Sequence, residues 1–147
     1  MSDQATATAQ KKVGPQIQVD LQELLDSLFM VLTDKESMVI KKRFALNGEQ
    51  KQTLEKIGKH FNVTRERIRQ IESIALSKLK RTVRTTRLDE VNGLAKDVLR
   101  NNGGLLREDK LITECLKRIA GAKDIDGAVL RLSFSIDPDM ISGSRSN

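Results

Sequence analysis

The residues best suited to specific chemistry lie in one short segment, residues 64–73. Arg65, Glu66 and Gln70 carry side chains that can hydrogen-bond to base edges: Arg to guanine, Gln to adenine and Glu to the amino group of cytosine. At about 100° per residue, Glu66 and Gln70 fall on the polar side of a helix. The opposite side is an apolar stripe formed by Ile68, Ile71, Ala75 and Leu79. The pattern predicts a helix that presents base-recognition groups to the major groove of DNA.

Further polar and basic residues surround these groups. Ser73 and Ser77 continue the polar face, Arg69 flanks one edge beside Arg65, and Arg67 and Lys78 flank the other edge. Flanking cations suit phosphates, which position a protein on the duplex. The alternative interpretation is an amphipathic surface helix whose charged face is simply solvated.

A second helix must precede this one to position it. Leu54, Ile57 and Phe61 share one face at helical spacing. Gly58 lies beside that face, where a glycine costs up to about 1 kcal/mol relative to alanine. Such a residue needs a packing reason, and a closely crossing neighbour would supply one.

The turn between the two helices is about three residues long. Asn62 is of the type that most readily adopts a left-handed conformation without being glycine. Val63 can then turn inward, and Thr64 can cap the next helix through its hydroxyl. So short a turn predicts a steep helix crossing, as in a helix-turn-helix.

Residues 33–81 resemble region 4, the promoter-recognition domain of bacterial sigma factors of the housekeeping family. The run VTRERIRQIE at residues 63–72 is nearly identical to that family's recognition helix, and residues 32–36 and 42–44 fit the helix before it. The resemblance implies that Arg65, Glu66 and Gln70 recognise bases of a −35-type promoter element. It also implies that RNA polymerase is a partner, through the flap of its beta subunit.

The resemblance gives the remaining site residues as well. The positions near the DNA backbone, other base edges or bound activators are Arg43, Leu54, Glu55, Arg67 and Arg69. The full set of expected DNA-contacting residues is Arg43, Thr53, Leu54, Glu55, Thr64, Arg65, Glu66, Arg67, Arg69, Gln70 and Ser73. Two positions depart from the family: Ile74 and Ser77 stand where basic residues usually serve activator contact or phosphate binding.

Charge is concentrated in the same part of the chain. Residues 34–87 hold 15 Lys and Arg against 6 Asp and Glu, a net charge of +9, whereas the whole chain carries +6. Such a basic segment suits nucleic acid. An anionic membrane is disfavoured because no broad apolar stripe with aromatic anchors accompanies the charge. Without Trp or Tyr, stacking of single-stranded RNA bases is also disfavoured.

The chain divides into two expected units between tails. Residues 1–16 are expected to be a disordered tail, and residues 17–81 the helix-turn-helix domain. Thr33 and Glu36 form a capping-box signature for a helix that we expect Asn47 and Gly48 to end. Residues 82–87 form a basic connector, which is an extension of the recognition helix, a linker along phosphates or simply a solvated linker.

The second unit, residues 88–141, is followed by a tail at 142–147. Apolar residues at helical spacing predict a helix up to the break at 101–104 and another around Cys115, which we interpret as core packing. Residues 128–136 suit either a strand or a helix. The run VLRNNGGLL at 98–106 resembles winged helix-turn-helix modules such as that of the RNA polymerase delta subunit, which favours a helix at 126–136. The wing would then come from residues 138–147 and is either vestigial or cut short.

Enzyme functions find little support. His60 is the single histidine and Cys115 the single cysteine, so neither a metal set nor a catalytic dyad with an orienting group is apparent. We expect no cofactor, and a cytoplasmic, nucleoid-associated location since no signal peptide or membrane span is evident.

The sequence therefore predicts an all-α protein, a sigma region 4-like helix-turn-helix domain followed by a small winged-helix-like domain. We expect a sequence-specific DNA-binding regulator or sigma-like factor that cannot open a promoter alone, because the sequence before Leu21 is too short for a promoter-melting region. The competing hypothesis is a sigma mimic that occupies the polymerase flap without recognising DNA.

Overall fold

The described part of the chain folds into helices, as expected. The computed structural model describes residues 16–46, 48 and 50–140. The α-helices are α2 (Leu21–Phe29), α3 (Asp34–Phe44), α4 (Leu54–Phe61), α5 (Arg65–Thr82), α6 (Leu88–Asn101), α7 (Glu108–Lys117) and α8 (Gly127–Ile136), with short 3₁₀ helices η1 (Val83–Thr85) and η2 (Asp124–Asp126). Within these ranges the extended pairing is limited to one isolated parallel bridge between Ile17 and Ile119.

Threonine side chains begin three consecutive helices. The hydroxyls of Thr33, Thr53 and Thr64 each accept a hydrogen bond from the backbone N–H three residues later, at 3.1–3.2 Å. At Thr33 the predicted capping box is complete, because Glu36 also accepts from the Thr33 N–H at 2.9 Å. These caps satisfy amide groups that a helix start leaves free, so the local sequence fixes where α3, α4 and α5 begin.

The end of α3 differs from the prediction. We expected Asn47 and Gly48 to end it, but the helix ends at Phe44 and Ala45 takes the left-handed conformation (φ 55°, ψ 41°). The chain turns early because Leu46 then points into the core, where it is 5% exposed, and its N–H bonds the Lys41 carbonyl at 3.0 Å. Asn47 lies outside the described residues, as does the expected disordered tail up to residue 15.

Two hydrophobic clusters hold the molecule together. The smaller one lies between α3, α4 and α5 and consists of Val39, Ile57, Ile68 and Ile71, with Leu54, Phe61 and Val63 packed against it. The larger one is shared by α2, α3 and the C-terminal half of α5 with α6, α7 and α8. Side chains from both expected units therefore pack in one core.

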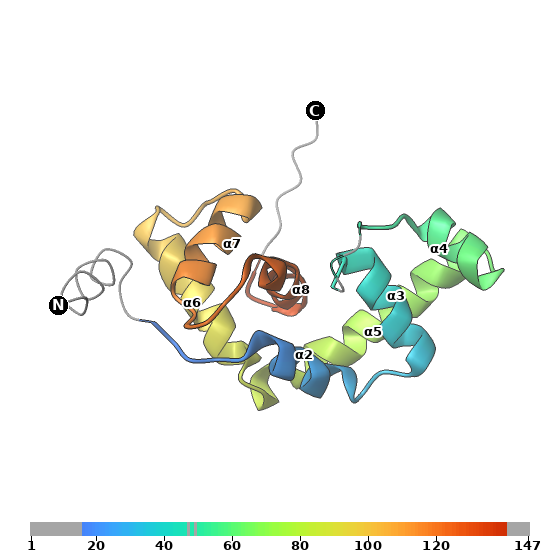
Figure 1. Cartoon of the computed structure of the whole chain (residues 1–147), viewed down its shortest axis with the longest axis horizontal. Helices are drawn as coiled ribbons and strands as arrows, with labels where there is room; N and C mark the ends of the chain where they lie inside the picture. Colours follow the sequence, from blue (N-terminus) through green and yellow to red (C-terminus); the bar gives the residue numbers. More distant parts are fainter. Residues whose placement is uncertain (1–15, 47, 49, 141–147) are drawn as a thin grey trace.

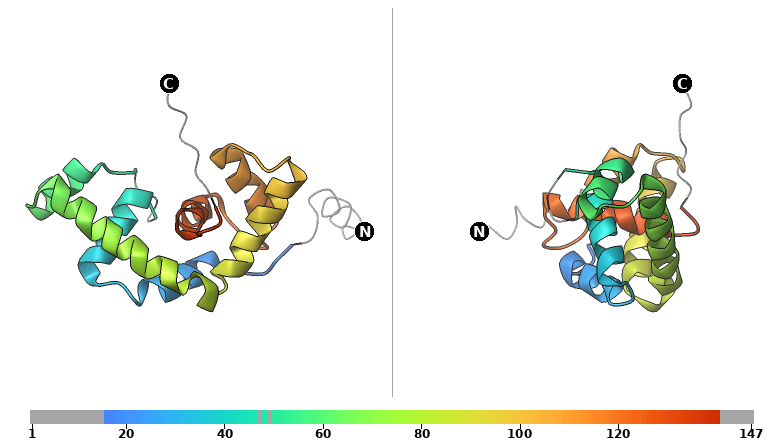
Figure 2. Two further views of the ribbon diagram at one scale, coloured as in Figure 1. Left: turned by 180° about the vertical axis from the view of Figure 1, so that it is seen from behind. Right: turned by 90° about the vertical axis from the view of Figure 1, so that its right-hand side faces the viewer.

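Helix α8 lies at the centre of this arrangement. Figures 1 and 2 show α5 and α6 as two arms that meet at η1, with α8 between them and α4 at the far end of the α5 arm. Seven of the ten residues of α8 are buried, which explains its ambiguous sequence pattern: a helix surrounded on most sides shows no clear 3.6-residue period. The helix favoured for residues 126–136 is confirmed.

Polar contacts join the second half to itself and to the N-terminal segment. The Asn92 and Ser133 side chains hydrogen-bond in the buried interface between α6 and α8. Ile17 exchanges backbone hydrogen bonds with Arg118 and Ala120, both at 2.8 Å. The winged-helix assignment and the division into two domains remain predictions. Of the segment expected to form the wing, residues 141–147 lie outside the described ranges.

Candidate nucleic-acid interface

The turn between α4 and α5 has the geometry that the sequence predicts. Asn62 adopts the left-handed conformation, with φ 57° and ψ 44°. Gly58 is buried, and a Cβ placed on it would stand 2.7 Å from the Val63 carbonyl oxygen and 3.4 Å from the Arg65 nitrogen. The close neighbour that requires glycine is thus the backbone of the turn itself. The tight turn sets the first residues of α5 against the end of α4.

The two faces of α5 are separated as expected. Ile68, Ile71, Ala75 and Leu79 are each at most 5% exposed. The exposed side of the first three turns carries Arg65, Glu66, Arg67, Arg69, Gln70 and Ser73. The second half of the molecule packs against α5 from the other side, through α8. The three expected base-recognition residues, Arg65, Glu66 and Gln70, therefore face solvent.

Neighbouring side chains on this face are ordered relative to one another. The Arg69 guanidinium donates to the Glu66 carboxylate at 2.6 and 3.0 Å, from Nη2 and Nε. This hydrogen bond is the main reason that the pKa of Glu66 lies below its usual value. Arg67 donates a longer hydrogen bond, 3.4 Å, to the Gln70 side chain. Arg65 forms no ion pair within the described residues, so its guanidinium is available to a ligand.

Arg43 has a structural role that the sequence did not reveal. It lies half-buried on α3, and its Nε donates to the Glu72 carboxylate on α5 at 3.1 Å. One terminal nitrogen donates to the Gln52 carbonyl, just before α4, at 3.2 Å. A single guanidinium thus joins all three helices of the motif. Its expected contact with DNA remains a prediction.

The start of α4 holds the other expected contacts. Thr53 is an exposed N-cap, Leu54 packs against the smaller cluster, and Glu55 is exposed and forms a loose ion pair with Lys59 at 3.7 Å. Thr64 caps α5 in the same way that Thr53 caps α4. These residues lie at helix N-termini, where backbone amides and the helix dipole favour an anion such as a DNA phosphate.

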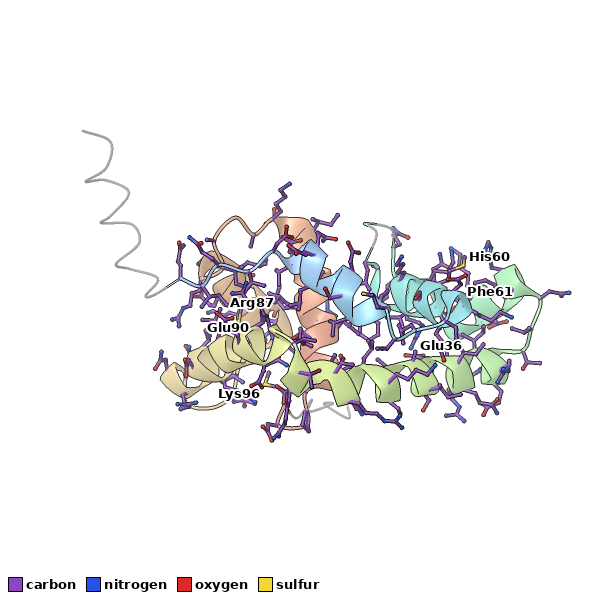
Figure 3. All side chains as sticks on the ribbon, turned by 90° about the horizontal axis from the view of Figure 1, so that it is seen from below. Glu36, His60, Phe61, Arg87, Glu90 and Lys96 are labelled. Atoms are coloured by element: carbon purple, nitrogen blue, oxygen red, sulfur yellow. The ribbon has the colours of Figure 1, made fainter. Side chains whose placement is uncertain are left out.

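The sequence suggested that Lys78 is a free cation on the flank of the recognition face, but the structure shows it in an ion pair. Its ammonium lies 2.7 Å from the Glu36 carboxylate, which is nearly buried between α3 and α5 (Figure 3). Burial alone raises the pKa of Glu36, but hydrogen bonds from Lys78 and Thr33 outweigh that effect and leave the pKa below its usual value. Lys78 therefore joins α5 to α3. The spacing of one helix gives no sign of such a tertiary pair.

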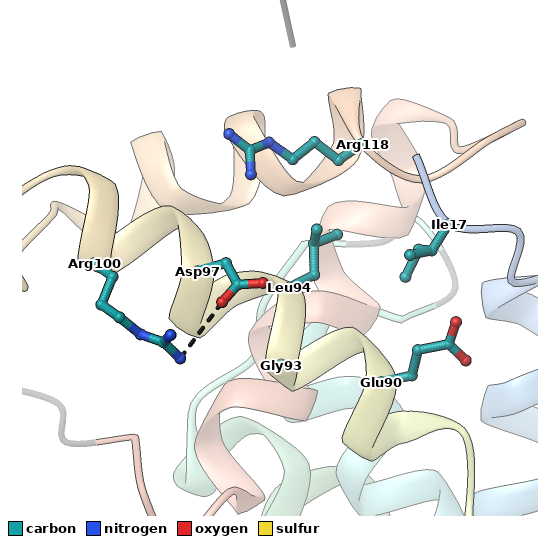
Figure 4. Close-up of a pocket in the computed structure, with 7 residues that line it drawn as sticks. All are labelled: Ile17, Glu90, Gly93, Leu94, Asp97, Arg100 and Arg118. Carbon is teal, nitrogen blue, oxygen red and sulfur yellow. Dashed lines mark ion pairs between the residues drawn. The ribbon is translucent and has the colours of Figure 1, made fainter. Parts of the chain in front are cut away.

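In the second half, the described residues up to 140 carry exposed charges of both signs. Cys115 is buried, and desolvation raises the pKa of its thiol to about 12, which agrees with its interpretation as core packing. A shallow depression on α6 is bordered by residues of both charges, among them Asp97 and Arg100, paired at 3.4 Å, and Arg118 (Figure 4). Such mixed charge contrasts with the concentrated basic residues of the helix-turn-helix.

Comparison with known families agrees with this geometry. Residues 28–81 match the family described as Sigma-70, region 4. The match includes α3, α4, α5 and the turn between α4 and α5, and it stops before α6. This part of the chain is a region 4 helix-turn-helix, a domain with a DNA-binding role in transcription. None of the helices within the described ranges has the length and apolar character needed to span a bilayer.

Proposed function

We propose that this protein, whose residues 28–81 form a sigma-70 region 4 helix-turn-helix, is a transcription regulator or sigma-like factor that binds −35-type promoter DNA together with RNA polymerase. The single observation that carries the proposal is the exposure of Arg65, Glu66 and Gln70 on the outer face of α5. The site needs no cofactor and no catalysis of its own. Such a role places the protein in the cytoplasm, at the nucleoid.

The proposed mechanism divides the work between specificity and positioning. The first turns of α5 enter the major groove, where Arg65 binds guanine and Gln70 adenine, while ionised Glu66 accepts from cytosine. The helix N-termini at Thr53 and Thr64 lie against phosphates. The Arg69–Glu66 pair is already formed in the protein without DNA, which lowers the entropy cost of ordering these side chains on DNA.

Binding to duplex DNA tests the proposal. Fluorescence anisotropy would compare a −35-type duplex with a scrambled duplex of equal length at one salt concentration, since affinities depend on salt. We expect the wild type to prefer the promoter duplex. We expect Arg65→Ala to lose about 1 to 3 kcal/mol of that preference, concentrated at one base pair.

The matched control is Arg107→Ala. Arg107 is exposed on the second half and forms a loose pair with Asp109 at 3.4 Å, so its loss should leave the preference unchanged. An equal loss by Arg65→Ala on every sequence would mean that Arg65 only binds phosphate. Equal binding of both duplexes by the wild type would overturn the proposal in favour of a sigma mimic that docks on the beta flap without recognising DNA.

A further inference from the structure

The outer face of α5 continues well beyond the proposed base-recognition residues. The helix has 18 residues, about 27 Å at 1.5 Å per residue. The major groove is about 12 Å wide and 8.5 Å deep, so it accommodates only the first turns of such a helix. In the proposed docking, where the N-terminal turns of α5 enter the groove, its C-terminal half passes over the wall of the groove, where the phosphates lie.

The C-terminal end of α5 and the 3₁₀ helix η1 after it carry three basic side chains: Lys80 and Arg81 on α5 and Arg84 on η1, here called the distal basic patch. All three are exposed, whereas Leu79 and Val83 beside them are at most 1% exposed. By the helical step of α5, Lys80 and Arg81 lie on the same side as Glu66 and Gln70. Arg84 follows them in η1. Figure 3 shows side chains projecting outward along the whole length of α5. The patch and the recognition residues form one continuous surface.

The charges of the distal basic patch are not used inside the protein. None of its members forms an ion pair within the described part of the chain, whereas neighbouring Lys78 and Arg87 pair with Glu36 and Glu90. From residue 67 to residue 87 the sequence contains a single acid, Glu72, and its carboxylate is already bound to Arg43. Three uncompensated cations on one surface favour a polyanion.

Between the two ends of the face lie small side chains. Ser73 and Ser77 are exposed on the line from Gln70 to the patch. The patch begins ten residues after Gln70, which is about 15 Å along the axis. Short side chains let the wall of a groove approach the helix in this interval. One large apolar side chain of α5, Ile74, is exposed beside this line, at 48%. The centre of a protein interface more typically holds a cluster of apolar or aromatic anchors.

We propose that the distal basic patch binds the phosphate backbone of the duplex beside the recognised site, as a second contact that is independent of sequence. This inference rests on the proposed function for the placement of α5 in the groove. The patch extends the footprint of the protein beyond the recognised bases. It supplies affinity and salt dependence, whereas Arg65, Glu66 and Gln70 supply specificity.

The first test is the salt dependence of binding by the triple variant Lys80→Ala, Arg81→Ala, Arg84→Ala. Each phosphate contact contributes about 0.9 to the slope of log K against log salt, so we expect the slope to fall in magnitude by up to about 2.7. Affinity should fall by the same factor on promoter and scrambled duplexes. A second variant with Lys80→Arg, Arg81→Lys and Arg84→Lys keeps the charges and should keep the slope.

The matched control removes three exposed charges elsewhere: Arg107→Ala, Lys110→Ala and Lys117→Ala on and beside α7. This control has the same net charge as the alanine variant of the distal basic patch, but its substitutions lie in the second half of the molecule. We expect it to retain the wild-type slope. Equal slopes for this control and for the variant Lys80→Ala, Arg81→Ala, Arg84→Ala would overturn the proposal, because the effect would then come from net charge alone.

The second test varies the DNA. A duplex that ends beside the recognised site is compared with duplexes extended by about ten base pairs, one helical turn, on one side or the other. The wild type should gain affinity from one extension, and the distal-patch variant should not. An equal gain for both proteins would exclude the backbone contact and leave an acidic protein surface as the partner.

If the wild type failed to distinguish promoter from scrambled DNA, the proposed function would fail, while the comparison of salt slopes would still test the distal basic patch.

Discussion

Gly58 on α4 lies against the carbonyl oxygen of Val63, so close that a Cβ on Gly58 would be 2.7 Å from that oxygen. The contact is with backbone, which cannot rotate away as a side chain can. It fixes how tightly the chain turns before α5. Because Arg65 follows two residues later, this one contact helps to set where the recognition face begins.

Gly58→Ala should destabilise the protein by about 1 to 3 kcal/mol, because overpacking forces the turn to move. Chemical denaturation followed by circular dichroism measures the change. The matched control is Gly93→Ala in α6, where an added Cβ meets nothing within 4 Å. Alanine is favoured over glycine in a helix, so this variant should gain up to about 1 kcal/mol. Equal stabilities for the two variants would show that the turn has room for a methyl group.

The Arg43–Glu72 pair should couple α3 to the recognition helix. A double-mutant cycle with Arg43→Ala and Glu72→Ala is expected to give a coupling free energy of about 1 kcal/mol, since both groups are largely shielded and hydrogen-bonded. The same cycle on the exposed pair Lys59–Glu55, at 3.7 Å, should give about 0.5 kcal/mol or less. A coupling at Arg43 no larger than this would contradict its structural role.

Acid should remove the contribution of Glu36 to stability. The pKa of the Glu36 carboxyl in the folded protein is lowered from the usual 4.5. As the pH falls, the unfolded chain therefore takes up a proton at Glu36 before the folded protein does. The ionised carboxylate thus stabilises the fold at pH values above 4.5. The stability difference between wild type and Glu36→Gln should be largest above pH 4.5 and shrink as the pH falls through the lowered value. Denaturation curves at several pH values give the difference. A constant difference would mean that the Lys78–Glu36 pair contributes no charge-dependent stability.

Leu130→Ala should weaken both halves of the molecule together. Leu130 is fully buried in the larger cluster, and its truncation should cost about 2 to 5 kcal/mol. Amide hydrogen exchange should show lost protection in α3 and α5 as well as in α6 and α7. Leu105→Ala is the control, because Leu105 is 84% exposed. Loss of protection confined to α6 and α7 would instead indicate two independently folding domains.

Local signals were enough to predict the motif. The left-handed turn at Asn62, the caps at Thr33 and Thr64, and the buried stripe from Ile68 to Leu79 all follow from residue type and spacing, and all are confirmed. These features depend on neighbours within about four residues, which a single sequence contains.

The features that the sequence left unknown depend on distant partners. The Arg43–Glu72 and Lys78–Glu36 pairs join positions 29 and 42 residues apart, and either cation alone resembles a free phosphate ligand. Ala45 turns left-handed because Leu46 must reach the core, although alanine gives no sign of a helix end. The shared cluster around α8 was also unexpected, because hydrophobic periodicity shows which face is buried but not what covers it.

Helix α5 belongs to both hydrophobic clusters: Ile68 and Ile71 pack in the smaller one, Ala75 and Leu79 in the larger one. One uninterrupted helix thus begins in the smaller cluster and ends in the larger one. No break in α5 separates the two clusters. A rotation of its first turns therefore has no hinge at which it could be absorbed before it reaches the larger cluster. In the proposed docking, a strain that bound DNA imposes on the first turns of α5 would therefore reach the packing around α8.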